Sequence, residues 1–399
     1  MTRSKPCTWV LLSCSLALLA APGARGQELV PERVWVLAQG PGESVARVGI
    51  ARARLDQGVT LFAAVEARLD GRPVVVSEAE AVELPDGRVP AARLRRPATL
   101  PAAAGWTLAW SKVQPVGDSY NNTRGGFHWD AIEYRTFPWA APDAPGAPWS
   151  RPADARPLPP YADAQGGLGT MAFQVELARE GAAPLASPGA GSLHRGGLSS
   201  QVTRVALRRD DSYLGRLTEL FNTPYIWGSA GEPPAEHQAE RLIGSDCADF
   251  IVYGARRLGK ELPYRATWHL PEVASTVARA ARVDADGRFV TERGQPVRIG
   301  AGAGEIQPGD LLLFPGHVGA LREDRAPLGV LDLNDVLIHT YWAPPCEQPI
   351  RDTAYTQSRV RVLRWRRGAQ RTRRRRMGEL PGTRSIRPRS SRSSCTALA

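Results

Sequence analysis

The stretch Asp246-Cys247-Ala248-Asp249-Phe250-Ile251 decides what fold and chemistry this chain is expected to have. Ser245 or Asp246 can cap a helix here, and apolar residues then recur at helical spacing as far as Gly259. The pattern predicts a helix that begins near Cys247, so the thiol would lie at the positive end of the helix dipole. A thiolate is stabilised there, and nearby backbone amides can donate to an oxyanion. Cys247 is therefore a candidate nucleophile for acyl transfer.

Two histidines follow on predicted strands. His317 comes directly after the Pro315-Gly316 turn, and His339 lies inside an apolar strand. A Cys at a helix start, a strand His as base and a second polar strand residue that orients the base are typical of cysteine hydrolases. The alternative interpretation of Cys247 is a buried structural thiol or a disulfide with Cys346.

The sequence around these residues predicts one more helix and several short strands. A helical face over residues 214–221 ends at Asn222-Thr223-Pro224, where proline stops the helix. Asp286-Gly287 predicts an inserted hairpin over Val283 to Ile299. The strands are predicted at residues 311–314, 318–321 and 336–342. We expect this domain to span residues 201–366.

Residues 27–180 are predicted to form an all-β domain, because from Val34 to about Leu177 apolar and polar residues mostly alternate. Asp70-Gly71 and Pro85-Asp86-Gly87 predict two tight turns. Prolines crowd residues 138–160, a composition that resists helix and central strand. The Gly/Ser/Ala/Pro-rich stretch 181–200 lacks periodicity and is predicted to link the two domains.

The chain has 399 residues, with 51 Lys+Arg against 40 Asp+Glu, but its excess positive charge lies in the C-terminal tail. Thirteen arginines and one acid, Glu379, occupy residues 361–399, and the chain from residue 27 to 360 is mildly acidic. The basic net charge is therefore no evidence for a specific nucleic-acid site. Residues 367–399 are predicted to be a disordered Arg-rich tail, whose charge would attract anionic envelope surfaces.

The first 26 residues have the pattern of a signal peptide. Two basic residues precede an apolar stretch from Thr8 to Ala21, and the small-residue sequence Ala24-Arg25-Gly26 follows. Cleavage before Gln27 is expected to give an exported protein, periplasmic or extracellular. A lipoprotein attached through Cys14 is the alternative. No apolar run reaches about 18 residues, so no transmembrane segment is expected.

These motifs, in this order, resemble the NlpC/P60 cysteine peptidases of bacterial cell-wall turnover. The similarity covers residues 210 to about 365. The segments that carry it are Thr223-Pro224-Tyr225-Ile226-Trp227-Gly228, similar to P-Y-x-W-G-G; the Cys247 stretch, similar to D-C-S-G-F-V; Leu262-Pro263-Tyr264-Arg265-Ala266-Thr267, similar to L-P-R-T/S; Pro308-Gly309-Asp310-Leu311 and Gly316-His317-Val318-Gly319, similar to P-G-D-L and H-V-G-I; and Ile338-His339, similar to the later strand with the third polar residue. Ala248, Asp249 and Ser229 depart from the family's Ser, Gly and Gly at those places.

By this resemblance the chain would have an α+β, papain-like fold, with the helix-borne Cys packed on an antiparallel sheet behind the all-β domain. Cys247 would be the nucleophile, His317 the base and acid, and His339 the residue that orients His317. The residues that would bind substrate or stabilise the oxyanion are Tyr225, Trp227, Asp246 and Thr267. Asp246 would lie near the free amine of the substrate, and the alternative is that it only caps the helix. The activity implied is hydrolysis of an amide bond in peptidoglycan stem peptides.

Two other functions fit the same residues. A non-catalytic cell-envelope binding or scaffold protein is favoured by the substitutions at Ala248 and Asp249, and an amidase or acyltransferase of the same fold would act outside peptidoglycan. No cofactor is expected, and no metal site is predicted, because the remaining histidines lack C-x-x-C or H-E-x-x-H partners. Removal of the leader would leave three cysteines, so at least one thiol is expected to stay unpaired.

Overall fold

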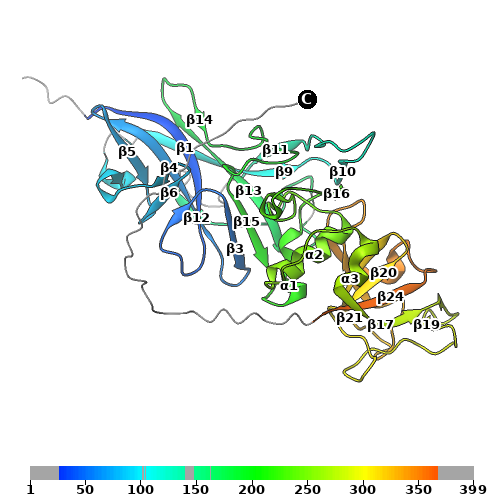
Figure 1. Ribbon diagram of the computed structural model, residues 1–399. Coiled ribbons are helices and arrows are strands. Elements are labelled where there is room, and N and C mark those ends of the chain that lie inside the picture. Colours follow the sequence, from blue (N-terminus) through cyan, green and yellow to red (C-terminus); the bar gives the residue numbers. More distant parts are fainter. Residues whose placement is uncertain (1–26, 101–102, 104, 140–147, 162, 367–399) are drawn as a thin grey trace, which may run out of the picture. The chain divides into compact units, whose positions relative to one another are not determined.

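The computed structural model describes residues 27–100, 103, 105–139, 148–161 and 163–366 (Figure 1). The predicted signal peptide, residues 1–26, and the predicted tail, residues 367–399, lie outside the described residues.

The first sheet is built from N-terminal strands. Its strands are β1 (Leu29–Gln39), β2 (Ala46–Arg47), β4 (Thr60–Leu69), β5 (Arg72–Ser77), β6 (Val82–Leu84), β7 (Gly87–Arg88), β8 (Leu94–Arg95) and β12 (Ser150–Pro152). Within the described residues their order is β7-β6-β2-β1-β4-β5-β8, with β12 paired to β4. Asp70 and Gly71 join β4 to β5 with positive φ angles of 50° and 79°, as a two-residue hairpin of type I′ requires. Both predicted turns are confirmed, since Pro85-Asp86 joins the paired strands β6 and β7.

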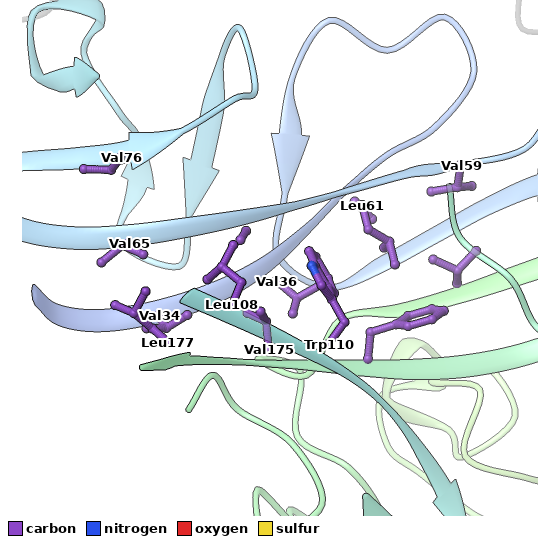
Figure 2. Packing of buried hydrophobic residues seen from close by; sticks show 14 of the residues in the cluster. Val34, Val36, Val59, Leu61, Val65, Val76, Leu108, Trp110, Val175 and Leu177 are labelled. Carbon is purple, nitrogen blue, oxygen red and sulfur yellow. The ribbon is translucent and has the colours of Figure 1, made fainter. Parts of the chain in front are cut away.

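The second sheet packs against the first. Its strands are β3 (Ile50–Arg54), β9 (Trp106–Pro115), β11 (Tyr134–Pro138), β13 (Gly169–Arg179), β14 (Leu185–Ala186) and β15 (Arg204–Arg208). In the described part of the chain the order is β11-β9-β13-β15-β3, with β14 paired to β13. Figure 2 shows the core between the sheets, where Val36 and Val65 from the first sheet belong to one buried cluster with Trp110 and Val175 from the second. Alternating apolar residues supply this cluster, as the period of two predicts.

A third sheet carries the C-terminal part. Its strands are β17 (Ala274–Ala280), β20 (Leu311–Phe314), β21 (His317–Glu323), β22 (Val336–His339), β23 (Cys346–Pro349) and β24 (Val360–Trp365), in the order β17-β24-β20-β21-β22-β23 over the described residues. The α-helices of the described residues are α1 (Tyr213–Leu217), α2 (Cys247–Arg257) and α3 (Leu270–Val273). Phe250 and Ile251 of α2 share a buried cluster with Val318 and Ile338 of this sheet. The predicted insert forms the hairpin of β18 (Arg282–Val283) and β19 (Phe289–Val290), and Phe289 belongs to a separate cluster with Leu312 and Leu337.

Two ladders join the N-terminal and C-terminal strands. Strand β15 follows the predicted linker in sequence, yet it pairs with β13 and with β3 of the second sheet. Strand β10 (Ser119–Asn121) pairs in parallel with β16 (Tyr225–Trp227), which precedes the predicted nucleophile. The two predicted domains therefore share backbone hydrogen bonds.

The predicted papain-like α+β fold is wrong. The described structure is mostly β, with 39% of residues in strands and 12% in helices, and a papain-like arrangement is not evident in it. Helical spacing correctly located α1 and α2, but α1 has five residues and α2 eleven. Three strands that the sequence analysis did not predict, β17, β23 and β24, complete the third sheet instead. No helix among the described residues combines the length and apolar character needed to cross a bilayer.

Candidate active site

Helix α2 begins at Cys247 because Asp246 caps it. The Asp246 backbone is extended, and its carboxylate oxygen Oδ1 accepts hydrogen bonds from the N–H groups of Ala248 and Asp249, both at 2.9 Å. Burial raises the pKa of Asp246 well above its usual range, and the Asp249 carboxylate adds to the effect. The predicted helix start is confirmed, and Asp246 rather than Ser245 is the cap.

Cys247 is a buried free thiol. Among the described cysteines, neither Cys247 nor Cys346 forms a disulfide, and Cys247 is only 3% exposed. Burial raises the pKa of Cys247, Asp246 raises it further, and the backbone amide of Val318 partly opposes both. The expectation of a depressed thiol pKa is therefore wrong for this state of the protein. The amides of Ala248 and Asp249 both donate to the Asp246 cap, and the Ala248 amide lowers the pKa of Cys247 only in part against burial.

His317 and His339 form a buried pair next to this thiol. His317 is the first residue of β21 and directly precedes Val318, and its Nε2 lies 3.0 Å from Nδ1 of His339 on β22. Burial lowers the pKa of His339 to about 4, and burial together with His339 lowers the pKa of His317 well below its usual range. Both imidazoles are therefore neutral near pH 7.

Gln348 of β23 decides where the protons of this pair reside. Its side-chain nitrogen lies 2.9 Å from Nε2 of His339. With this nitrogen donating, Nδ1 of His339 must donate to Nε2 of His317, so neutral His317 carries its proton on Nδ1. If the Gln348 amide is rotated by half a turn, its oxygen faces Nε2 of His339. His339 then donates to Gln348, and His317 donates to His339. Nδ1 of His317 then becomes a bare acceptor, which is the form a general base needs.

Two buried polar atoms near the thiol lack partners. Nδ1 of His317 and the Tyr225 hydroxyl form no hydrogen bond with any described residue. Burial raises the pKa of Tyr225, and charge on Cys247 or Asp246 would raise it further, which reflects how near these groups lie. A buried donor or acceptor without a partner is costly. Both atoms are therefore available to a group that enters beside Cys247.

Half-exposed aromatic rings cover this region. Trp227 stacks on Trp342 with ring centroids 5.8 Å apart, and Trp342 lies 5.1 Å from the ring of Tyr225. Tyr341 lies 5.0 Å from the His317 ring. Trp227, Tyr341 and Trp342 are each between 38% and 45% exposed, whereas the residues beneath them are buried. These rings provide an apolar surface at the edge of the site.

The N-terminal strands hold part of this surface in place. Asn121 of β10 pairs with Trp227 of β16. The fully buried Asn122 then donates to the Gly228 carbonyl at 3.1 Å and to the Gln238 side chain at 2.8 Å. The backbone on both sides of Trp227 is therefore fixed by residues more than a hundred positions earlier in the chain.

Ser229 and Asp249, two of the residues that differ from the motifs that the sequence resembles, contact each other. The Ser229 hydroxyl donates to Asp249 at 2.6 Å and accepts from the Asp246 amide at 3.1 Å. Nε2 of His237 lies 3.3 Å from the same Asp249 carboxylate, and its ring stacks on Tyr264 at a centroid distance of 3.6 Å. Nδ1 of His237 accepts from the Ala239 amide, so Nε2 carries the proton that faces Asp249. Ser229, Asp249 and His237 are all buried and form one polar cluster at the start of α2.

The structure thus brings together most of the predicted site residues. Cys247, His317, His339, Tyr225, Trp227 and Asp246 gather at the start of α2, while no hydrogen bond or ring contact recorded for the described residues connects Thr267 with the thiol. Sequence reasoning missed Gln348 and His237. Gln348 of β23 lies opposite Leu337, and β23 is a short strand without alternation that was not predicted. His237 lies before α2 in an irregular segment without a helix or strand periodicity, so the sequence pattern gave no signal for it.

Known proteins add no identification. No family model, curated protein or solved structure matches this chain. Among the described residues, no group of three or more His, Cys, Asp or Glu side chains is placed to hold a metal ion.

Proposed function

We propose that this chain is an exported cysteine hydrolase that cleaves an amide bond in peptidoglycan stem peptides. The observation that carries the proposal is the hydrogen-bonded series His317, His339 and Gln348 on strands packed against α2, the helix that begins at Cys247; one nitrogen of His317 is fixed by His339 and the other has no described partner. Export and the peptidoglycan substrate rest on the leader pattern and on the motif resemblance.

The geometry supports acyl transfer through a thioester. His317 Nδ1 takes the proton from the Cys247 thiol, and the sulfur forms a bond to the amide carbon as the carbonyl electron pair moves onto oxygen. The Tyr225 hydroxyl, which otherwise lacks a partner, donates to that oxyanion. The tetrahedral intermediate expels the amine, which takes the proton from His317. Water then gives a proton to His317, attacks the thioester and releases the acid and the free thiol.

The neutral ground state fits this sequence of steps. A thiol with a raised pKa and an imidazole with a lowered pKa do not form an ion pair in the free protein. Proton transfer must therefore accompany attack, and the Gln348 amide must present its oxygen for His317 to become an imidazolium. In that orientation His317 donates to His339, and His339 donates to Gln348.

Asp246 is proposed to accept the free ammonium of the substrate as well as cap the helix. Both cap bonds end on Oδ1, so an ammonium is proposed to approach Oδ2, with the Gly228 amide also near the carboxyl group. Because burial holds the pKa of Asp246 high, a cation beside it would restore the ionised carboxylate. Faster turnover of free-amine peptides than of N-acetylated ones is expected, and equal turnover would remove this role.

A binding or scaffold protein is the second candidate. The burial of Cys247 and its raised pKa favour it, because a resting thiol of this kind is a weak nucleophile.

Muropeptide digestion separates the two candidates. The chain from Gln27 onward is incubated with purified muropeptides, and product masses are read by mass spectrometry. The hydrolase proposal expects new fragments that gain one water, from the unmodified chain and from the matched control Cys346→Ala, but not from Cys247→Ala. Intact muropeptides with every variant, together with measurable binding, would support the scaffold instead.

A further inference from the structure

A cavity of about 310 Å³ lies apart from the thiol, where β9, β13 and β15 meet the segments around Pro224 and Pro345. Its wall is mainly apolar, with Val113, Met171 and Ile243 among the residues that line it. Arg204 and Asp118 are the charged residues in the described lining, and Asp118 is exposed whereas Arg204 is 2% exposed. The cavity is therefore an apolar space with a single buried cation.

Arg204 has too few partners for a buried guanidinium. It donates to the backbone carbonyls of Leu198 at 3.4 Å and Ser199 at 3.2 Å, and its Nε is buried without a partner among the described residues. A guanidinium has five N–H hydrogens, so three remain unused. No described carboxylate lies within 4.0 Å of it, whereas the buried Arg208 has Asp211 and Glu219 as partners.

The charged groups nearest to Arg204 are two further arginines. Burial lowers the pKa of Arg204 to about 10; Tyr134 partly opposes this, and the nearby Arg241 and Arg52 lower the pKa as well. The group nevertheless stays charged at neutral pH. Because an uncompensated buried charge is strongly unfavourable, the site as it stands lacks an anion.

We propose that this cavity binds a small amphipathic monocarboxylate, with its carboxylate on Arg204 and its apolar body against the apolar wall. The planar fork of a guanidinium matches a carboxylate, and three free N–H groups are enough for a bidentate pair. The volume falls at the lower end of the range for small-molecule sites, where apolar walls and a few polar groups are usual.

The cavity also touches the catalytic strands. Cys346 lines it and pairs in β-sheet register with His339, and Pro224 lines it directly before Tyr225. The free thiol of Cys346 is thus a reporter within the wall of the cavity, and the proposal stands independently of whether Cys247 is catalytic.

Alkylation of Cys346 tests the proposal on the whole chain from Gln27 onward. N-ethylmaleimide labelling of Cys346 is followed by peptide mapping, with octanoate as the probe, octanol as its neutral counterpart and inorganic phosphate as an anion without an apolar body. Octanoate is expected to slow labelling at least fivefold in a saturable manner, while octanol and phosphate leave the rate unchanged.

Two variants provide the matched comparison. Arg204→Met should abolish protection by octanoate. Arg241→Met should retain it, because Arg241 is a second buried guanidinium that donates to the same Leu198 carbonyl but does not line the cavity. Equal protection by octanol or phosphate, no protection by octanoate, or full protection in Arg204→Met would each overturn the proposal. If Arg204→Met does not fold, the comparison of octanoate with octanol on the unmodified chain still decides it.

Discussion

Two buried histidines near the start of α2 have opposite kinds of partner. His317 contacts another imidazole, His339, and the second nitrogen of its ring is unpartnered among the described residues. His237 contacts the Asp249 carboxylate, accepts from a backbone amide and stacks on Tyr264, so both of its nitrogens are used. The difference teaches that burial alone does not mark a catalytic histidine. The informative feature is a ring nitrogen without a described partner near the proposed nucleophile.

Replacing each of the two histidines with alanine should have the largest and most different effects. His317→Ala is expected to lower kcat/KM by about 10⁴-fold or more, because the base of a nucleophile–base unit is lost. His237→Ala should keep most of the activity and lose about 1–3 kcal/mol of unfolding free energy, because it leaves Asp249 with one partner fewer. Muropeptide kinetics and urea unfolding measure the two effects, and an inactive but stable His237→Ala protein would contradict the assignment.

A change at Gln348 should have the next largest effect. Gln348→Leu is expected to lower kcat by roughly 10²-fold with little change in KM, because His339 loses the group that selects its tautomer. Gln348→Glu, whose carboxylate only accepts, should recover much of the rate at neutral pH. Equal losses for both variants would mean that Gln348 serves packing rather than proton placement.

Acid should weaken the fold through the His317–His339 pair. Histidines in the unfolded chain have a pKa near 6.5, whereas His339 in the folded protein has a pKa of about 4. Between these values the unfolded chain binds more protons, so the stabilisation is fully present above about pH 6.5 and is lost as pH falls towards 4. His339 alone contributes at most about 3 kcal/mol to this change.

Urea unfolding measured between pH 7.5 and 4 checks the acid effect. His339→Gln should flatten the dependence of stability on pH, while His128→Gln, which changes an exposed ring, should leave it as in the unmodified chain. If the unfolding free energy of His339→Gln changed with pH as steeply as that of the unmodified chain, the His317–His339 pair would be excluded as the cause of the acid effect.

The smallest effect is expected at Ser229. Ser229→Ala removes the donor to Asp249 and the acceptor of the Asp246 amide, which should cost about 1–2 kcal/mol of unfolding free energy and leave the pH dependence of kcat unchanged. A double-mutant cycle with His237→Ala should show coupling, because both side chains contact the same carboxylate. Additive losses would show that the three residues do not act as one cluster.

The sequence predicted the local features of the site better than its architecture. The cap at Asp246, the helix from Cys247 and the strands that contain His317 or follow it directly and that contain His339 follow from short-range patterns, although β22 ends at His339 rather than at the predicted residue 342. The fold class was wrong because β17, β23 and β24 have neither clear alternation nor turn signals, and their pairing is fixed by distant strands. The pKa of Cys247 was misjudged for the same reason. Burial by distant elements outweighs the local helix dipole.

The pairing of β10 with β16 affects the order in which parts of the protein fold. Asn122 and Gly228, which hold the backbone beside Trp227, are 106 residues apart, and contacts of such long range form slowly. The aromatic surface over Cys247 can be completed only after β10 and β16 have both been synthesised and have met. A thiol exposed to alkylation during refolding should therefore become protected late, together with the N-terminal sheets, and the time course of Cys247 protection would report completion of the whole fold.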